Sequence, residues 1–170
     1  MSRVLLVHPP VSVARDFIDY PYFSDLGAVQ LAAVLRQQGH QVSLVDAFAL
    51  ERSSLTWVGD RALLGAPVAD VLERAKAAGE VDAVIVTFSP FHRPPDRDPV
   101  LGQVLVGLQA HGVPVLLVDA YQSGQHYVDA EGKDVLAAYP EVRCWVKYEA
   151  EATVPRLLQR LAKGELIDGL

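Results

Sequence analysis

The chain has a single cysteine, Cys144, among its 170 residues. One cysteine excludes an internal disulfide, a thiolate zinc site and a cysteine-bound iron–sulfur cluster within this chain. Cys144 lies inside an apolar run, which favours a buried position over a reactive one.

Long apolar runs and an excess of basic residues are also missing. No segment approaches the ~20 apolar residues of a membrane helix, and a strand is expected too early to leave room for a secretory signal. The net charge of −6 argues against a nucleic-acid surface, which carries an excess of Lys and Arg. We therefore expect one cytoplasmic domain, residues 1–170, without a nucleic-acid or membrane partner.

Five short runs of β-prone residues recur along the chain. Most are continuously apolar, which is typical of strands buried on both faces of a parallel sheet. The runs are residues 4–7, 41–45, 83–88, 114–118 and 142–146.

Segments with helical periodicity separate these runs. Gly39 is placed to close the first helix, and Asp98 and Pro99 are expected as the cap and first residue of the third. The apolar stripes lie within residues 28–35, 68–75, 101–108 and 151–161.

Alternating strands and helices, with connections too long for hairpins, predict a doubly wound α/β fold of the flavodoxin-like or Rossmann-like kind. The expected sheet has five parallel strands in the order 2-1-3-4-5, with helices on both faces. Residues 11–26 and 48–66 are expected to be long irregular connections.

Ligands of such a fold bind outside the carboxyl ends of the strands, where the strand order reverses. The loops expected there combine aromatic rings with hydroxyl groups, which suits a large flat ligand with a polar edge. Capping of the sheet by these aromatic side chains explains the same composition equally well.

Several familiar sites are excluded. A dinucleotide site needs glycines directly after the first strand, whereas Pro9 and Pro10 stand there and remove amide donors. No P-loop Gly-Lys-Ser/Thr occurs, and a flavin-phosphate loop is missing after the first strand. A phosphoacceptor aspartate is missing after the third strand, which ends in Thr87 and Ser89.

Several sequence blocks together resemble one family. The first strand runs into Pro9-Pro10, residues 26–46 and 81–87 match in spacing, and residues 148–153 resemble a Gly-Glu-Gly-Glu turn. Residues 167–170 look like the segment leading into a catalytic barrel. Over nearly its whole length the chain thus resembles the N-terminal cobalamin-binding domain of cobalamin-dependent radical S-adenosylmethionine enzymes.

This resemblance implies a module that holds cobalamin over the upper end of the sheet, with the nucleotide tail between strands. The radical S-adenosylmethionine barrel, in cis or in trans, would supply the 4Fe-4S cluster and S-adenosylmethionine for methyl transfer, cyclisation or rearrangement. The chain has no Cys-x-x-x-Cys-x-x-Cys motif, so we expect no catalytic residues and no metal ligands in it. It is then an excised domain or a stand-alone relative.

The resemblance also implies which residues contact the cofactor. Thr87 and Ser89 are expected to donate to the tail phosphate or a corrin amide, with capping of the following segment as the alternative. His8 is placed either to approach cobalt or to hydrogen-bond at the strand end. The full set of expected cofactor-binding residues is Pro10, Val11, Thr87, Ser89, Asp119, Ala120, Tyr121 and Glu149.

Two departures from the family pattern favour an alternative function. Asp119-Ala120 stands where the family has Gly-Gly, and Tyr148 replaces the first glycine of the last turn. Both changes narrow the channel that the nucleotide tail would use. The alternative is a degenerate fold that has lost the ligand and acts as a structural or interaction domain. A stand-alone enzyme is a weaker third hypothesis, because no nucleophile–base arrangement is apparent.

Overall fold

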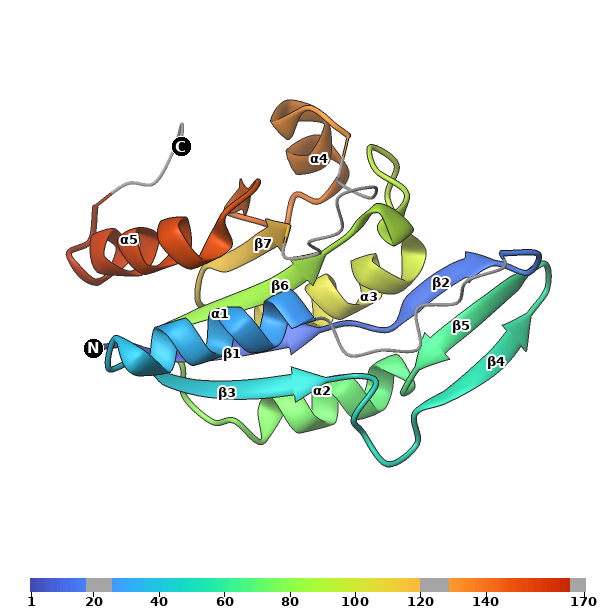
Figure 1. Cartoon of the computed structure of the whole chain (residues 1–170), viewed down its shortest axis with the longest axis horizontal. Coiled ribbons are helices and arrows are strands. Elements are labelled where there is room, and N and C mark those ends of the chain that lie inside the picture. Colours follow the sequence, from blue (N-terminus) through green and yellow to red (C-terminus); the bar gives the residue numbers. More distant parts are fainter. Residues whose placement is uncertain (18–25, 120–128, 166–170) are drawn as a thin grey trace.

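The computed structural model describes residues 1–17, 26–119 and 129–165. Its central feature is a five-stranded parallel sheet in the order β3-β1-β6-β7-β8 (Figure 1). The strands are β1 (Arg3–His8), β3 (Gln41–Asp46), β6 (Ala83–Phe88), β7 (Val115–Asp119) and β8 (Cys144–Val146). The predicted α/β class and the five-stranded parallel sheet are confirmed.

The strands of this sheet are the five runs expected from the sequence. If the five runs are counted along the chain, their order across the sheet is second, first, third, fourth and fifth. The strand numbers differ from the expected 2-1-3-4-5 because three further strands, which the sequence analysis did not anticipate, intervene along the chain.

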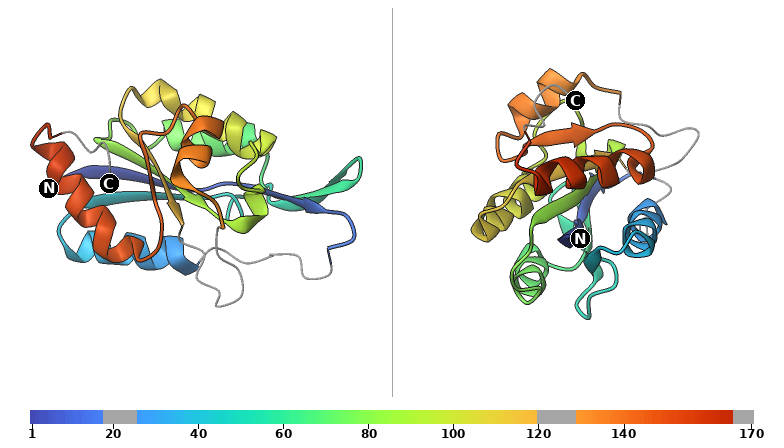
Figure 2. Two further views of the ribbon diagram at one scale, coloured as in Figure 1. Left: turned by 90° about the horizontal axis from the view of Figure 1, so that it is seen from above. Right: turned by 90° about the vertical axis from the view of Figure 1, so that its left-hand side faces the viewer.

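Helices cover both faces of the parallel sheet (Figure 2). One face packs against α2 (Val68–Lys76), α3 (Pro99–Leu108) and α4 (Gly132–Ala138), and the other against α1 (Leu26–Gln37) and α5 (Ala150–Ala162). Each helix places an apolar stripe on buried strand residues, so the sheet lies between two hydrophobic cores.

The helix boundaries follow from local chemistry. Asp98 caps α3, because its Oδ1 accepts hydrogen bonds from the backbone N–H groups of Val100 and Leu101, each at 2.9 Å. Gly39 follows α1 with a φ of 86°, the left-handed conformation that glycine adopts without penalty. The short helix α4 was not expected from the sequence.

A second sheet corrects the expectation that residues 11–26 and 48–66 are irregular throughout. The strands β2 (Val11–Ala14), β5 (Arg61–Gly65) and β4 (Ser54–Val58) form an antiparallel sheet in the order β2-β5-β4. Gly59 and Asp60 form a two-residue turn between β4 and β5, and Gly59 has a φ of 62°. We call this sheet the antiparallel arm; it extends beyond the carboxyl ends of β1 and β3 (Figure 1).

The antiparallel arm joins the parallel sheet through a tightly packed connection. Only Pro9 and Pro10 separate β1 from β2. The backbone N–H of Ala47 donates to the carbonyl of His8 at 2.9 Å, and that of Ala66 donates to the carbonyl of Ala47 at 2.8 Å. Gly65 has a φ of 103°, which strains any residue with a Cβ, and a Cβ there would also lie only 3.3 Å from the Cβ of Ala47. This connection therefore favours glycine.

Candidate functional site

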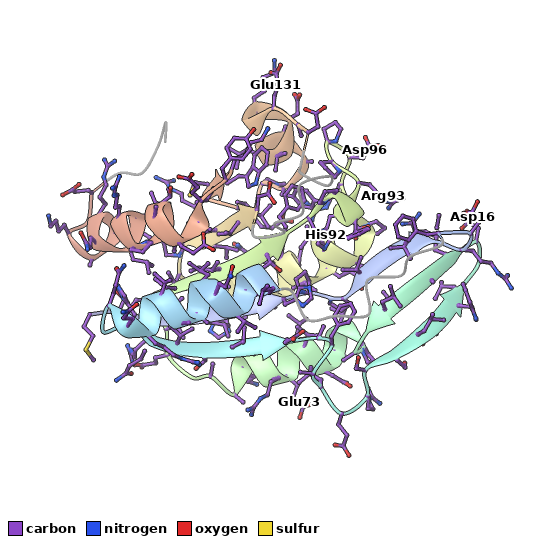
Figure 3. All side chains as sticks on the ribbon, viewed as in Figure 1. Asp16, Glu73, His92, Arg93, Asp96 and Glu131 are labelled. Carbon is purple, nitrogen blue, oxygen red and sulfur yellow. The ribbon has the colours of Figure 1, made fainter. Side chains whose placement is uncertain are left out.

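The carboxyl ends of the five parallel strands, with the residues that follow them, form one end of the parallel sheet (Figure 3). We call this end the rim. At one side of the rim, His8 and Asp46 end β1 and β3 and lie opposite each other in register. The Nδ1 of His8 lies 2.9 Å from Oδ1 of Asp46, which also accepts the N–H of Phe48. Because a carboxylate only accepts, Nδ1 carries the proton.

His8 is further fixed by a stacked ring. The imidazole lies parallel to the ring of Phe48, with centroids 5.0 Å apart and an interplanar angle of 16°. Of the two roles considered for His8, the hydrogen-bonded strand end is therefore the one that the structure shows.

Thr87 places a hydroxyl group at the end of the central strand β6. Thr87 is only 1% exposed, and its Oγ1 has no hydrogen-bond partner within the described part of the chain. Alternate residues of β6, Ala83 and Ile85, pack on the face covered by α1 and α5, so Thr87 belongs to that face. A buried hydroxyl left without a partner costs about 1–3 kcal/mol, so this atom is suited to an incoming acceptor or donor.

His92 provides a second buried polar atom behind the rim. Its Nδ1 accepts the backbone N–H of Ser89 at 3.0 Å, which leaves the proton of the neutral ring on Nε2. Burial lowers the pKa of His92 to about 4, so the ring is neutral at pH 7. Within the described residues Nε2 has no hydrogen-bond partner, and the ring stacks on Phe88 at 5.6 Å.

The loop that carries His92 is held by a group of polar contacts around Tyr139. The backbone N–H of Asp98 donates to Tyr139 Oη at 2.8 Å. The guanidinium of Arg97 lies 5.3 Å from the centroid of the Tyr139 ring and pairs with both carboxylate oxygens of Glu141, at 2.7 and 2.9 Å. These contacts fix residues 96–98 against the end of α4, and so fix the position of the rim loop.

The segment after β8 combines aromatic rings with a cation. The Nζ of Lys147 lies 5.4 Å from the Trp145 ring centroid and 5.2 Å from that of Tyr148, and it donates to the carbonyl of Ala130 at 3.3 Å. Trp145 is buried, and its Nε1–H has no hydrogen-bond partner among the residues described. Tyr148 is 59% exposed, so its ring lies on the surface of the rim.

Two consecutive residues of this segment have left-handed backbone. Tyr148 has a φ of 60° and Glu149 a φ of 26°, immediately before α5. Side chains with a Cβ rarely adopt this region, which costs roughly 1–2 kcal/mol per residue. Backbone strain of this kind is concentrated at binding and active sites.

Three of the expected cofactor-binding residues lie at the ends of β6 and β7, but not on one face of the sheet. Thr87 belongs to the face covered by α1 and α5, whereas Asp119, like Leu117, belongs to the face covered by α2, α3 and α4. Thr87 and Ser89 flank Phe88, which lies opposite Asp119 in the register of β6 and β7. All three of these polar residues are buried. Glu149 lies farther along the rim and is exposed, while Ala120 and Tyr121 lie outside the described residues.

Pro10 and Val11 lie at the base of the antiparallel arm. Both are buried, and Val11 pairs with Leu64 of β5. Their side chains are thus covered by an element that the sequence analysis did not anticipate. The Gly59-Asp60 pair between two β-prone runs was the sequence signal for this hairpin.

A separate cavity of about 930 Å³ lies at the opposite end of the parallel sheet. Leu72 and Lys76 of α2 and Gly107 of α3 contribute to its walls, beside Arg3 at the start of β1. None of the expected cofactor-binding residues that the structure describes lines this cavity. The rim therefore remains the candidate site.

Within residues 1–17, 26–119 and 129–165, no group of three or more His, Cys, Asp or Glu side chains is arranged to hold a metal ion. None of the helices in those ranges has the length and apolar character needed to cross a membrane.

The rim thus combines left-handed backbone, an exposed aromatic ring and buried polar atoms that have no hydrogen-bond partner in the part of the chain that the structure describes. Comparison with known proteins adds no assignment to this geometry. No protein-family model matches the chain, and no curated protein has a matching sequence.

Proposed function

We propose that this chain is a cobalamin-binding module that positions the corrin for a neighbouring radical S-adenosylmethionine barrel. Two kinds of argument support the proposal: the resemblance in the order of its sequence blocks, and the chemistry of the rim. The single observation that carries it is the buried hydroxyl of Thr87 at the carboxyl end of the central strand, which has no hydrogen-bond partner among the described residues.

The Thr87 hydroxyl suits the polar groups of cobalamin. Phosphate oxygens and amide carbonyls accept hydrogen bonds, and the nucleotide tail and the corrin carry both. An acceptor that reached Oγ1 would remove the unfavourable free energy of a buried hydroxyl without a partner, about 1–3 kcal/mol. The hydroxyl therefore favours binding of such a ligand over the empty state.

The backbone at Tyr148 also fits the family pattern. The family has glycine at this position, and Tyr148 keeps the left-handed φ of 60° that glycine adopts most easily. The Tyr148 ring is 59% exposed, so it does not pack into the interior of the sheet. The Tyr148 side chain therefore does not block the interior of the sheet, so this departure from the family pattern no longer favours a ligand-free domain.

The proposed roles of the rim residues follow from their chemistry. Thr87 and Ser89 would donate to the tail or to corrin amides, whereas the carboxylates of Asp119 and Glu149 would accept from corrin amides. Ala120 and Tyr121 are proposed as further contacts, whereas Pro10 and Val11, which the arm covers, would only support the rim from beneath. Bound cobalamin would supply methyl-carrying or radical chemistry at cobalt, and this chain would orient and shield it.

Hydroxocobalamin binding tests the proposal directly. The purified chain is mixed with hydroxocobalamin, desalted and examined by visible spectroscopy, and we expect it to retain the corrinoid. Thr87→Val keeps the shape but removes the hydroxyl, so we expect about tenfold weaker binding, the effect of roughly 1.4 kcal/mol.

Thr56→Val is the matched control, because Thr56 is exposed on β4 of the antiparallel arm, away from the rim. It should bind hydroxocobalamin as the unmodified chain does. Absence of retained corrinoid at high protein concentration would count against the proposal.

The alternative function, a ligand-free structural or interaction domain, is favoured by one specific observation. Asp119 is buried where the family has glycine, so its carboxylate occupies space near the expected path of the nucleotide tail. If this alternative holds, the chain fails to bind hydroxocobalamin, and Asp119→Gly combined with Tyr148→Gly restores some affinity.

A further inference from the structure

The antiparallel arm ends in a strand with one open edge. In the described part of the chain, β4 has β5 as a neighbour on one side and lies at the end of its sheet. The outer edge of such a strand presents backbone N–H and C=O groups that can pair with another strand.

The composition of β4 offers none of the usual protection against such pairing. Proteins normally guard an open edge with Lys, Pro or an inward-pointing charge. Residues 54–58 read Ser-Leu-Thr-Trp-Val, without charge or proline. Trp57 is 48% exposed and Val58 60% exposed, which places apolar surface beside this edge.

The sequence around β4 is complementary to itself when it is read antiparallel about Thr56. Leu55 then lies opposite Trp57, and Thr56 lies opposite Thr56. Outside the strand the charges match as well, because Arg52 falls opposite Asp60 at the hairpin tip, once at each end of the symmetric pair. Opposite charges at both ends of one register favour pairing of the segment with its own copy.

We propose that β4 is a self-association surface, through which two copies of this chain pair in antiparallel fashion about a two-fold axis at Thr56. The product is a continuous six-stranded antiparallel sheet built from both arms. This inference does not depend on cobalamin binding, because the rim and β4 are different surfaces.

The backbone register of β4 supports this two-fold axis. In a hairpin with a two-residue turn, the closing residues Val58 and Arg61 form a hydrogen-bonded pair. Val58, Thr56 and Ser54 therefore form backbone hydrogen bonds with β5. Leu55 and Trp57, which alternate with them, direct their backbone N–H and C=O groups toward the outer edge. Leu55 would exchange hydrogen bonds with Trp57 of the second copy, and the two Thr56 side chains would meet at a close, non-hydrogen-bonded pair.

The charges beside β4 are already positioned for the contact. Arg52 donates from Nε to Oδ2 of Asp70 at 2.6 Å, yet 67% of its side chain is exposed. Asp60 of the second copy would approach this exposed guanidinium from the tip of its own hairpin. A five-residue strand buries little area, so we expect a weak, concentration-dependent dimer rather than an obligate one.

Substitution at Thr56 tests the proposal, because only this residue meets its own copy. By sedimentation or light scattering, we expect the mass to rise from 18.5 kDa toward twice that value as concentration increases. Thr56→Lys places two like charges opposite each other, and we expect at least tenfold weaker association. Thr153→Lys makes the same change on exposed α5 and should associate like the unmodified chain.

Two variants of opposite charge at Thr56 test whether Thr56 lies opposite its own copy. Thr56→Lys and Thr56→Glu should each be monomeric, and their equimolar mixture should dimerise again through the Lys–Glu pair. Thr56 is exposed, and circular dichroism verifies that each variant is folded. As a check without variants, amide exchange at Leu55 should slow as the unmodified protein is concentrated.

Three results would overturn the proposal. A chain that stays monomeric at every concentration overturns the proposal. So does a dimer that Thr56→Lys leaves intact, or a mixture of the two charged variants that stays monomeric.

Discussion

Tyr139 at the end of α4 accepts a hydrogen bond from the backbone N–H of Asp98 at 2.8 Å, across 41 residues of sequence. Asp98 in turn caps α3 through its side chain. Burial raises the pKa of Tyr139 to about 12, so the phenol remains neutral and available as a hydrogen-bonding group. One aromatic side chain therefore connects two helices and the loop behind the rim.

Loss of this hydroxyl should destabilise the fold. Tyr139→Phe leaves the N–H of Asp98 buried without its partner, and we expect the free energy of unfolding to fall by about 1–3 kcal/mol. Urea denaturation measures the change. Tyr148→Phe is the matched control, since Tyr148 is exposed, and it should change the free energy by less than about 0.5 kcal/mol. Equal stabilities for the two variants would contradict this account.

Loss of the Thr87 hydroxyl should have the opposite effect on stability. Because Oγ1 is buried without a hydrogen-bond partner in the described residues, Thr87→Val should leave the free energy of unfolding unchanged or raise it by about 1 kcal/mol. Thermal denaturation without cobalamin measures this. A clear loss of stability would mean that the hydroxyl already has a structural role.

His92 should make stability depend on pH. Burial lowers its pKa in the folded chain to about 4, whereas the unfolded chain titrates near 6.5. The unfolded state therefore binds the proton first as the pH falls, and stability contributed by neutral His92 is lost between about pH 6.5 and 4. The loss approaches roughly 3 kcal/mol.

Replacement of His92 isolates this contribution. In His92→Phe the free energy of unfolding should fall less steeply across that pH range than in the unmodified chain, whatever its absolute value. His111→Phe is the control, because His111 is not buried. An unchanged slope in His92→Phe would show that His92 is not the group that titrates.

Cys144 should resist alkylation in the native protein. Burial raises the pKa of its thiol to about 11, so the reactive thiolate is roughly 100-fold scarcer at neutral pH than for an exposed cysteine. Iodoacetamide labelling followed by mass spectrometry should be slow in buffer and fast in denaturant. Similar rates in both conditions would exclude the buried position.

Much of the parallel layer could be predicted from the sequence. Strands such as β6 are apolar at almost every position because both faces are covered by helices, and Asp98-Pro99 gives the start of α3 directly. The antiparallel arm was missed because β4 is mostly exposed and β5 begins with Arg61 and ends with Gly65, so neither strand shows the continuous apolar pattern. The turn chemistry of Gly59-Asp60 was the stronger signal there.

The candidate site was predictable only where topology determines it. The rule that ligands bind at the carboxyl ends of the strands selected Thr87, Ser89 and Asp119. All three lie at the ends of β6 and β7, with the side chains of Thr87 and Asp119 on opposite faces of the sheet. The pairing of His8 with Asp46 requires the register of β1 and β3, which residue patterns alone do not give. The burial of His92 depends likewise on stacking with Phe88, a contact formed only in the folded chain.

The connection between β1 and β2 has a mechanical consequence. Two imino acids with restricted φ angles, and the backbone bonds through Ala47 on either side, allow the arm one orientation relative to the rim. We therefore expect bending at the base of the arm to be opposed, because it would break the backbone hydrogen bonds that join Ala47 to His8 and Ala66.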